Sequence, residues 1–165
     1  MKIRIIGACG SGKSTAARML GTYFNISYYE IDNVVWDRSA ENLRFPVEVR
    51  DQTFREILDR EDWVLEGVQH HWTGDSFARA DVIFILNPHV LVRDYRIIKR
   101  FIRSRSGIEP WNYKQSFANL LKMMKEWNHK YDMDEVLAAT SQYAHKRVMV
   151  GSATEMIRYL EVNRK

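Results

Sequence analysis

The sequence predicts one α/β domain, spanning residues 1–165, in which helices cover both faces of a parallel sheet. Two observations predict this fold. A glycine-rich motif joins an apolar run to a helical pattern near the start of the chain, and further apolar runs alternate with helical patterns up to its end. Because ligands of such sheets bind at the carboxyl ends of the strands, we expect one sheet edge to gather the functional residues.

The glycine-rich motif follows the apolar run at residues 3–6 directly. It matches the phosphate-binding P-loop pattern G-x-x-x-x-G-K-[ST] at every fixed position, with the residues Gly7, Ala8, Cys9, Gly10, Ser11, Gly12, Lys13 and Ser14. Such a loop needs a buried strand before it and a helix whose N-terminus faces the anion after it, and both flanks are present. A chance glycine turn would explain one glycine but not Lys13 and Ser14 in register.

The P-loop predicts that the chain binds ATP with Mg²⁺. Lys13 would reach the β- and γ-phosphates, and Ser14 would place its hydroxyl on Mg²⁺. Thr15 would add a hydroxyl and an amide near the α-phosphate. The net charge of +4 suits an anionic ligand, although it does not separate a nucleotide from a nucleic acid.

The remaining elements follow from periodicity and from signals at their ends. We expect strands at residues 3–6, 26–32, 62–67, 81–86 and 146–150, and helices at residues 13–24 and 47–60. Ser152 and Glu155 form a capping box that predicts the start of a last helix. Asp132 and Glu135 predict a similar start for an earlier one.

Two stripes separate along residues 91–105 when these are drawn as a helix. One stripe is basic and consists of Arg93, Arg96, Arg100 and Arg103; the other is apolar and consists of Leu91, Tyr95, Ile98 and Ile102. We therefore expect a helix with one core face and one arginine face. Arginine supplies planar, permanently charged donors for phosphoryl transfer, which predicts a catalytic lid at about residues 93–115 with its tip at 104–111. A solvated charged face is the alternative.

A nucleic acid is the alternative partner for the basic stripe. Further lysines and aromatic residues follow it, namely Lys114, Lys122, Lys125, Lys130, Trp111, Tyr113 and Trp127. A second set falls at helical spacing and is more typical of a core face: Phe117, Leu120, Leu121, Met124 and Trp127. We therefore favour a small-molecule acceptor over a nucleic acid as the partner.

Acidic residues follow two of the predicted strands. Asp32 ends the second strand, where a carboxylate would orient or deprotonate an acceptor hydroxyl, or bind Mg²⁺ through water; a helix cap is the alternative. Glu66 ends the third strand, where an acid would hold a metal-bound water, with a turn-forming role as the alternative. Residues 33–46 form a predicted acceptor-binding insertion, which contains Trp36 for stacking and Arg38 and Arg44 for phosphate contacts, or else a hydrophobic plug.

Other features of the sequence argue against a zinc site and indicate where in the cell the protein works. His70 and His71 follow the third predicted strand, but two adjacent histidines lack the ligand count and spacing of a zinc site, so we expect them to lie in a loop near the substrate. A single cysteine, Cys9, excludes an internal disulfide and fits a reducing compartment. No apolar run approaches the length of a membrane span and no signal peptide precedes the first strand, so we expect a cytoplasmic protein.

Five motifs together resemble those of small bacterial P-loop proteins of the DNA topology modulation or adenylate-kinase-like family. They are IIGACGSGKST, the ID-x-x-x-W of residues 31–36, WVLEG of 63–67, ADVIFILNP of 80–88 and R-x-x-KR of 96–100. The resemblance spans most of the chain. It implies the nucleoside and nucleotide kinase branch of the P-loop NTPases, a three-layer sandwich with strand order 2-3-1-4-5, an acceptor region after the second strand and a lid after the fourth.

The resemblance also implies roles for individual residues. Lys13 and Ser14 would bind the nucleotide and Mg²⁺, Asp32 would be the acid on the acceptor side, and Arg96 and Arg100 would be the lid arginines. The motifs that name the acceptor in adenylate kinases and deoxynucleoside kinases are missing after residue 67. The sequence therefore predicts a small-molecule kinase whose acceptor no motif identifies, with a nucleoside or nucleotide as the candidate. The alternative is a nucleotide-dependent regulator that binds nucleic acid or a protein.

Overall fold

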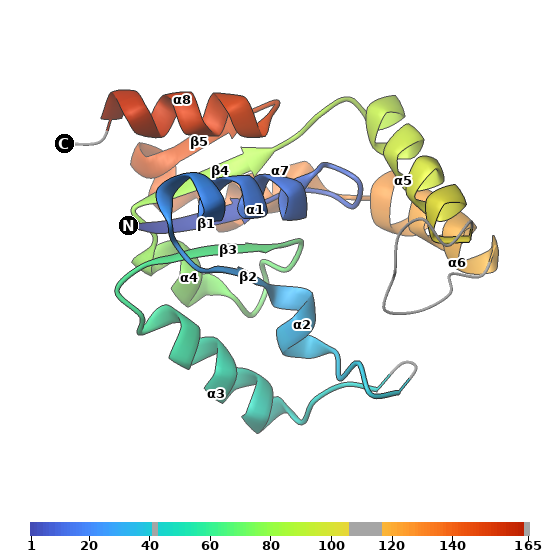
Figure 1. Ribbon diagram of the computed structural model, residues 1–165, viewed down its shortest axis with the longest axis horizontal. Helices are drawn as coiled ribbons and strands as arrows, with labels where there is room; N and C mark the ends of the chain where they lie inside the picture. The colour runs from blue at the N-terminus through green and yellow to red at the C-terminus, as the bar shows by residue number, and fades with distance from the viewer. Residues whose placement is uncertain (41–42, 106–116, 164–165) are drawn as a thin grey trace.

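The computed structural model describes residues 1–40, 43–105 and 117–163. Within these ranges five parallel strands form one sheet in the order β2-β3-β1-β4-β5 (Figure 1). The strands are β1 (Lys2–Ile6), β2 (Tyr28–Glu30), β3 (Trp63–Gly67), β4 (Val82–Leu86) and β5 (Arg147–Val150). The predicted fold class and strand order are confirmed. The second strand is shorter than predicted at its end, because Ile31 and Asp32 already belong to a helix.

The central strand β1 lies between β3 and β4, with Ile3 opposite both Val64 and Val82. Strands β3 and β4 are buried along their whole length. Continuous apolar runs are typical of parallel strands that are covered on both faces, which is why these strands were predictable from the sequence.

Helices α1 (Lys13–Phe24) and α8 (Ala153–Asn163) cover one face of the sheet. Ala17 and Leu20 of α1 pack there with Met156 and Leu160 of α8, and all four side chains are buried. The predicted capping box starts α8, since the amide of Glu155 donates to Ser152 Oγ at 3.3 Å.

The other face is covered by helices α2 (Ile31–Val35), α3 (Val47–Leu58), α4 (Gly74–Arg79) and α7 (Met133–Ala139). Phe54 and Leu58 of α3 pack in this cluster with Phe77 of α4 and Val136 of α7. A 3₁₀ helix, η2 (Ser141–Lys146), connects α7 to β5. The predicted cap of α7 is present, because Asp132 accepts a hydrogen bond from the amide of the third helical residue.

A third cluster lies off the sheet, beyond the carboxyl ends of the strands (Figure 1). It joins α5 (Val90–Arg105), α6 (Phe117–Lys122) and the π-helix η1 (Met123–Asn128). Its buried side chains are Ile97, Phe101, Leu120 and Met123. The α5 helix is thereby fixed next to the loop between β1 and α1.

The predicted core face of α5 is wrong. Leu91, Tyr95 and Ile102 are each at least 60% exposed, whereas Ile97, Phe101 and Arg93 are buried. The buried side chains lie beside the arginine stripe rather than opposite it, because α5 turns its arginine side toward the loop after β1. Periodicity detects a helix with two faces but not which of them meets the protein.

The prediction that the apolar residues at helical spacing after α5, namely Phe117, Leu120, Leu121, Met124 and Trp127, belong to the core is correct only in part. Leu120 is buried, but Phe117 is 61% exposed and Trp127 is 51% exposed. The π-helical hydrogen bonding of η1 widens each turn, so residues that share one face of an ordinary α-helix separate here. Trp127 instead lies beneath Lys122, whose Nζ is 5.9 Å from the ring centroid.

In the part of the chain that the structure describes, none of the helices is both long and apolar enough to span a membrane.

Candidate functional site

The loop between β1 and α1 has the backbone that the motif predicts. Gly10 and Gly12 adopt left-handed conformations, with φ of 74° and 101°, which residues with a side chain rarely adopt. A Cβ atom on Gly10 would lie 2.7 Å from the carbonyl oxygen of Arg93 on α5. The amide of Ser11 closes the turn on the Ala8 carbonyl at 3.2 Å. The glycines therefore give the loop its turn and allow α5 to pack directly against it.

The two residues at the start of α1 point in different directions. Lys13 is buried, and its Nζ donates to the Ala8 carbonyl at 2.9 Å, so its ammonium lies across the loop. The hydroxyl of Ser14 donates to Glu66 Oε1 at 2.6 Å. The structure thus brings together the two residues that the sequence predicts as metal-binding, although they lie far apart in the chain.

Three carboxylates interact at this edge of the sheet. Burial raises the pKa of Glu66, and the charge of Lys13 and the hydrogen bond from Ser14 oppose that rise. The negative charges of Glu30 and Asp32 also raise the pKa of Glu66. A hydroxyl and carboxylate oxygens are the hard ligands that Mg²⁺ prefers, and a cation would relieve the repulsion among these acids. The residues present therefore fit Mg²⁺.

Asp32 lies in the first turn of α2 instead of at the end of a strand. It is exposed, and its Oδ1 accepts a hydrogen bond from Gln69 Nε2 at 2.7 Å. Gln69 belongs to the loop after β3. Sequence reasoning missed this partner, because no local pattern connects the two positions and only the pairing of β2 with β3 brings them together.

Arg4 of β1 holds the loop after β3 through hydrogen bonds, and sequence reasoning missed this residue. Arg4 is fully buried in β1, and its Nη2 donates to the Gln69 carbonyl at 2.8 Å. Its Nε donates to Ser76 Oγ at 3.2 Å. Burial lowers the pKa of Arg4 to about 10, although the charge of Glu66 opposes the shift. The one cation inside the run Ile3–Ile6 is the signal that could have identified it.

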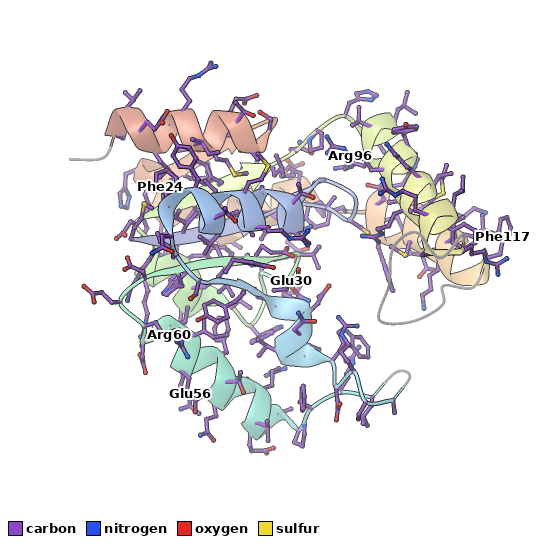
Figure 2. All side chains as sticks on the ribbon, viewed as in Figure 1. Phe24, Glu30, Glu56, Arg60, Arg96 and Phe117 are labelled. Atoms are coloured by element: carbon purple, nitrogen blue, oxygen red, sulfur yellow. The ribbon has the colours of Figure 1, made fainter. Side chains whose placement is uncertain are left out.

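Helix α5 supplies one arginine to the P-loop and another to the segment after β4. Arg96 Nη1 donates to the Ser11 carbonyl at 2.6 Å, and Figure 2 shows Arg96 on the side of α5 that faces the sheet. Arg93 is buried, and its Nη1 donates to Asn87 Oδ1 at 3.1 Å. Burial lowers the pKa of Arg93. Arg100 follows Arg96 one turn along the helix and is half-buried.

The predicted insertion at residues 33–46 is folded onto itself. Trp36 and Arg44 form an antiparallel bridge, and the Arg44 guanidinium lies 4.5 Å from the Trp36 ring centroid. Arg38 donates from Nη2 to Asn33 Oδ1 at 3.2 Å. Both arginines therefore contact residues of the insertion itself. Residues 41–42 of the insertion lie outside the described residues, as do residues 106–115 of the predicted lid, including Trp111, Tyr113 and Lys114.

A groove of about 370 Å³ lies beside the P-loop. Ser11, Gly12 and Thr15 line it on one side, Arg96 lines another, and the turn at residues 151–153 after β5 completes it. The groove thus starts at the end of the P-loop, and its size suits the nucleoside part of a nucleotide.

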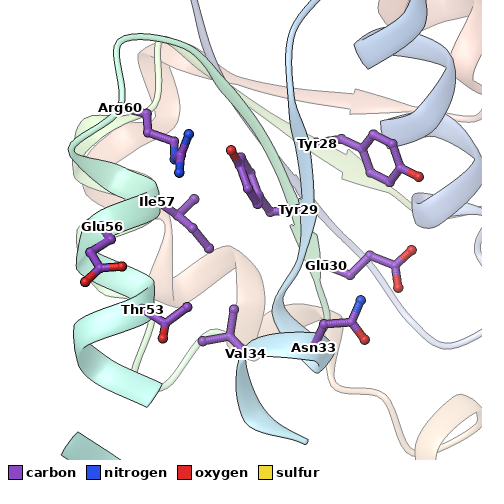
Figure 3. A pocket seen from close by; sticks show the side chains of 9 residues that line it. All are labelled: Tyr28, Tyr29, Glu30, Asn33, Val34, Thr53, Glu56, Ile57 and Arg60. Atoms are coloured by element: carbon purple, nitrogen blue, oxygen red, sulfur yellow. The ribbon is translucent and has the colours of Figure 1, made fainter. Parts of the chain in front are cut away.

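A second groove, of about 460 Å³, follows the free edge of β2 between that strand and α3 (Figure 3). Tyr29 and Arg60 lie on its walls, with the Arg60 guanidinium 5.6 Å from the Tyr29 ring centroid. Asn33 and Val34 of the predicted insertion line it, and none of its lining residues belongs to the P-loop. The groove is thus built without the P-loop, although its wall includes Glu30, whose charge raises the pKa of Glu66.

Known proteins resemble this chain in structure rather than in sequence. No protein-family profile and no curated protein matches the sequence. The chain superposes on a gluconokinase from Sinorhizobium meliloti 1021 with a TM-score of 0.55 and 15% identity, over 95% of this chain and 87% of the other. A shikimate kinase from Bacteroides thetaiotaomicron gives 0.55 and 14%, over 100% and 99% of the two chains. A shikimate kinase from Aquifex aeolicus vf5 gives 0.52 and 16%, over 99% and 98%. The chain has the fold of these kinases.

Proposed function

We propose that this chain is an ATP-dependent phosphotransferase that phosphorylates a hydroxyl group of a small molecule. The observation that supports the proposal most is the 2.6 Å hydrogen bond from Ser14 to Glu66, which unites the hydroxyl of a P-loop with a strand-end carboxylate. A P-loop alone indicates phosphate binding. The additional carboxylate gives the pair of oxygen ligands that a Mg²⁺-dependent transfer needs.

MgATP supplies the phosphoryl group. The P-loop backbone, from Gly7 to Gly12, would hold the phosphates, and Lys13 would turn its ammonium from the Ala8 carbonyl to their oxygens. Ser14 would bind Mg²⁺ directly, and Glu66 would bind it directly or through water. The groove that Thr15 lines would hold the nucleoside.

The acceptor would bind on the other side of the phosphates, near Asp32. Its exposed carboxylate would accept the proton of the acceptor hydroxyl as that oxygen attacks phosphorus. Gln69 orients the carboxylate through the 2.7 Å hydrogen bond to Oδ1, which leaves the other oxygen for the substrate. Trp36 and the arginines of residues 33–46 would form the outer wall of this acceptor site.

Arg96 would stabilise the negative charge on the transferred group. Its guanidinium is already within 2.6 Å of the P-loop, at the Ser11 carbonyl, so a small side-chain rotation would bring it to a phosphate oxygen. Arg100, one turn further along α5, would act as the second lid arginine. The exposed apolar stripe of α5 has no part in this proposal.

A screen of acceptors tests the proposed function. ADP release with MgATP would be measured over nucleosides, nucleoside monophosphates, and hydroxy acids such as gluconate and shikimate, which the names of the similar kinases suggest. We expect stimulation by one class of acceptor. A nucleoside or nucleotide would also support the narrower resemblance to the adenylate-kinase-like group.

The outcome that contradicts a kinase is tight ATP binding with no stimulation by any acceptor. That result would favour the nucleotide-dependent regulator. Trp127 and Lys122 would then be the first residues to test, because Trp127 is half-exposed beneath a lysine, as in sites that stack nucleic acid bases.

A further inference from the structure

Besides the Ser14–Glu66 pair, three other residues form a group of potential metal ligands. His70 and His71 belong to the loop after β3, and Glu135 lies in the first turn of α7. His70 Nε2 is 3.4 Å from Glu135 Oε2, and His71 Nδ1 is 3.6 Å from Glu135 Oε1. The three ligand atoms lie within 4.8 Å of one another. The sequence alone offered only the two histidines, because Glu135 comes from a distant helix.

The two distances to the glutamate suit a shared metal ion. Zn²⁺ binds histidine nitrogen and carboxylate oxygen at about 2.0–2.2 Å in tetrahedral geometry, which separates neighbouring ligand atoms by roughly 3.3–3.6 Å. The two nitrogen–oxygen distances have about this length, one to Oε2 and the other to Oε1, and the exposed Glu135 carboxylate can rotate to present one oxygen to both imidazoles. The His71 side chain is 71% exposed, so it can rotate to shorten the remaining distance between the two imidazoles.

The orientation of His70 is that of a metal ligand. Its Nδ1 lies 3.4 Å from the Val68 carbonyl, so a proton on Nδ1 would be shared with that oxygen and Nε2 would keep its lone pair. The side chain is 10% exposed, and Nε2 is buried without a hydrogen bond to any residue that the structure describes. A backbone carbonyl behind one ring nitrogen, with the other nitrogen free, is the arrangement that orients histidine ligands.

We propose that His70, His71 and Glu135 bind a Zn²⁺ ion at a site distinct from the Mg²⁺ site of the P-loop. Two imidazoles favour Zn²⁺ over Mg²⁺, which prefers oxygen ligands. The exposed His71 and Glu135 leave the fourth position open to water or to a small ligand. The ion would tie the loop after β3 to α7.

Metal binding at this site would also act on Gln69, which lies in the same loop after β3. Gln69, which holds Asp32, directly precedes His70. Bound Zn²⁺ would therefore restrict the loop that presents Gln69, and metal binding would reduce local opening of residues 68–71. The binding proposal itself does not depend on kinase activity.

Metal titration of the full chain tests the site. The protein is treated with a chelator, returned to buffer with ADP and excess Mg²⁺ so that the P-loop site is saturated, and titrated with Co²⁺ while visible absorption is recorded. We expect one equivalent of Co²⁺ to bind with the intense d–d absorption of a four- or five-coordinate ion, and Zn²⁺ to displace it.

Three variants assign the ligands. Glu135→Gln and His71→Gln change exposed side chains, so both should fold, and each should weaken Co²⁺ and Zn²⁺ binding by at least about tenfold. His145→Gln, at an exposed histidine outside the cluster, is the matched control and should bind as the native chain does. Circular dichroism of all four proteins checks that they are folded.

Three results would overturn the proposal. Absent binding, or equal binding by all four proteins, would mean that the cluster is a histidine–glutamate ion pair only. A strong thiolate-to-cobalt charge-transfer band would instead assign the metal to Cys9.

Discussion

The two sides of the candidate site are built differently. On the P-loop side, the functional groups are backbone amides and buried side chains, and Gly10, Gly12 and Lys13 are fixed by a strand, a turn and a helix. On the acceptor side, Asp32 is exposed and is held by one hydrogen bond from a loop residue. The side chains proposed for its outer wall contact the insertion itself, Arg44 on Trp36 and Arg38 on Asn33.

This difference suits the ligand that each side is proposed to bind. A phosphate chain is the same in every nucleotide, so a rigid backbone cradle suits it. An acceptor differs from one kinase to the next, and exposed side chains on loops can change without disturbing the sheet. Substitutions on the P-loop side should therefore abolish activity toward every acceptor, whereas those on the acceptor side should act on one substrate.

The largest effect is expected for Lys13→Ala. Loss of the ammonium should lower kcat/KM by about 10³-fold for every acceptor, because it removes positive charge from the phosphates in the transition state. Steady-state ADP release measures this. Arg18→Ala, an exposed cation on the same helix, is the control and should change kcat/KM by less than about twofold. Equal losses in both variants would contradict a specific role for Lys13.

Arg96→Ala should lower kcat by about 10²-fold, with a smaller change in ATP affinity, since its guanidinium is proposed to act mainly on the transition state. Lys99→Ala removes an exposed cation from the next turn of the same helix and serves as the control. A loss in ATP affinity alone, with kcat unchanged, would make Arg96 a binding residue rather than a catalytic one.

Asp32→Asn should lower kcat by about 10²-fold while the Kd for MgATP stays constant, because the change removes only the proton acceptor on the acceptor side. Single-turnover kinetics with isothermal titration of ATP separates the two effects. Glu48→Gln, at an exposed acid near the start of α3, is the control. If Asp32→Asn weakened ATP binding as strongly as it slowed transfer, Asp32 would belong to the nucleotide side.

Glu66→Gln should change how the stability of the chain depends on pH. Burial raises the pKa of Glu66, so the folded chain keeps this proton to a higher pH than the unfolded chain. The free energy of unfolding of the native chain should therefore fall as the pH rises from the ordinary glutamate pKa through the raised one. Glutamine has no proton to lose, so the variant should lack this slope and should be at least as stable at neutral pH.

Urea unfolding over a series of pH values measures that slope. Glu61→Gln, at an exposed acid, should keep it. A slope that persists unchanged in Glu66→Gln would mean that another group causes it.

The smallest effect is expected for Arg44→Leu. It removes the cation from the face of Trp36 and should destabilise the insertion by about 0.5–1 kcal/mol. The melting temperature should change slightly, while the KM for the acceptor should rise and the KM for ATP should not. A rise in the KM for ATP would contradict the division of the site into two sides.

The sequence predicted what depends on buried strands and on fixed spacing. The P-loop glycines and the apolar runs of β1, β3 and β4 have strong local signals, and the structure has those elements in place. The strand order came from the family resemblance rather than from periodicity, because the spacing of elements along a chain does not state which strands pair.

The features that could not be predicted from the sequence depend on contacts between segments that are distant in the chain. Gln69 meets Asp32, and Glu66 meets Ser14, only after the strands pair. The two stripes of α5 were recognised, but the apolar stripe was assigned to the core and is exposed, because the arginine side is the one that meets the P-loop. Trp127 is half-exposed within a π-helix, and the spacing of apolar residues does not distinguish a π-helix from an α-helix.

The most direct test of the account is the affinity for ATP with and without Mg²⁺, measured by titration calorimetry on the native chain and on Glu66→Gln. If Ser14 and Glu66 form the metal site, Mg²⁺ should strengthen ATP binding to the native chain by about tenfold or more, and most of that gain should disappear in Glu66→Gln. An affinity that Mg²⁺ strengthens equally in both proteins would contradict the proposed site.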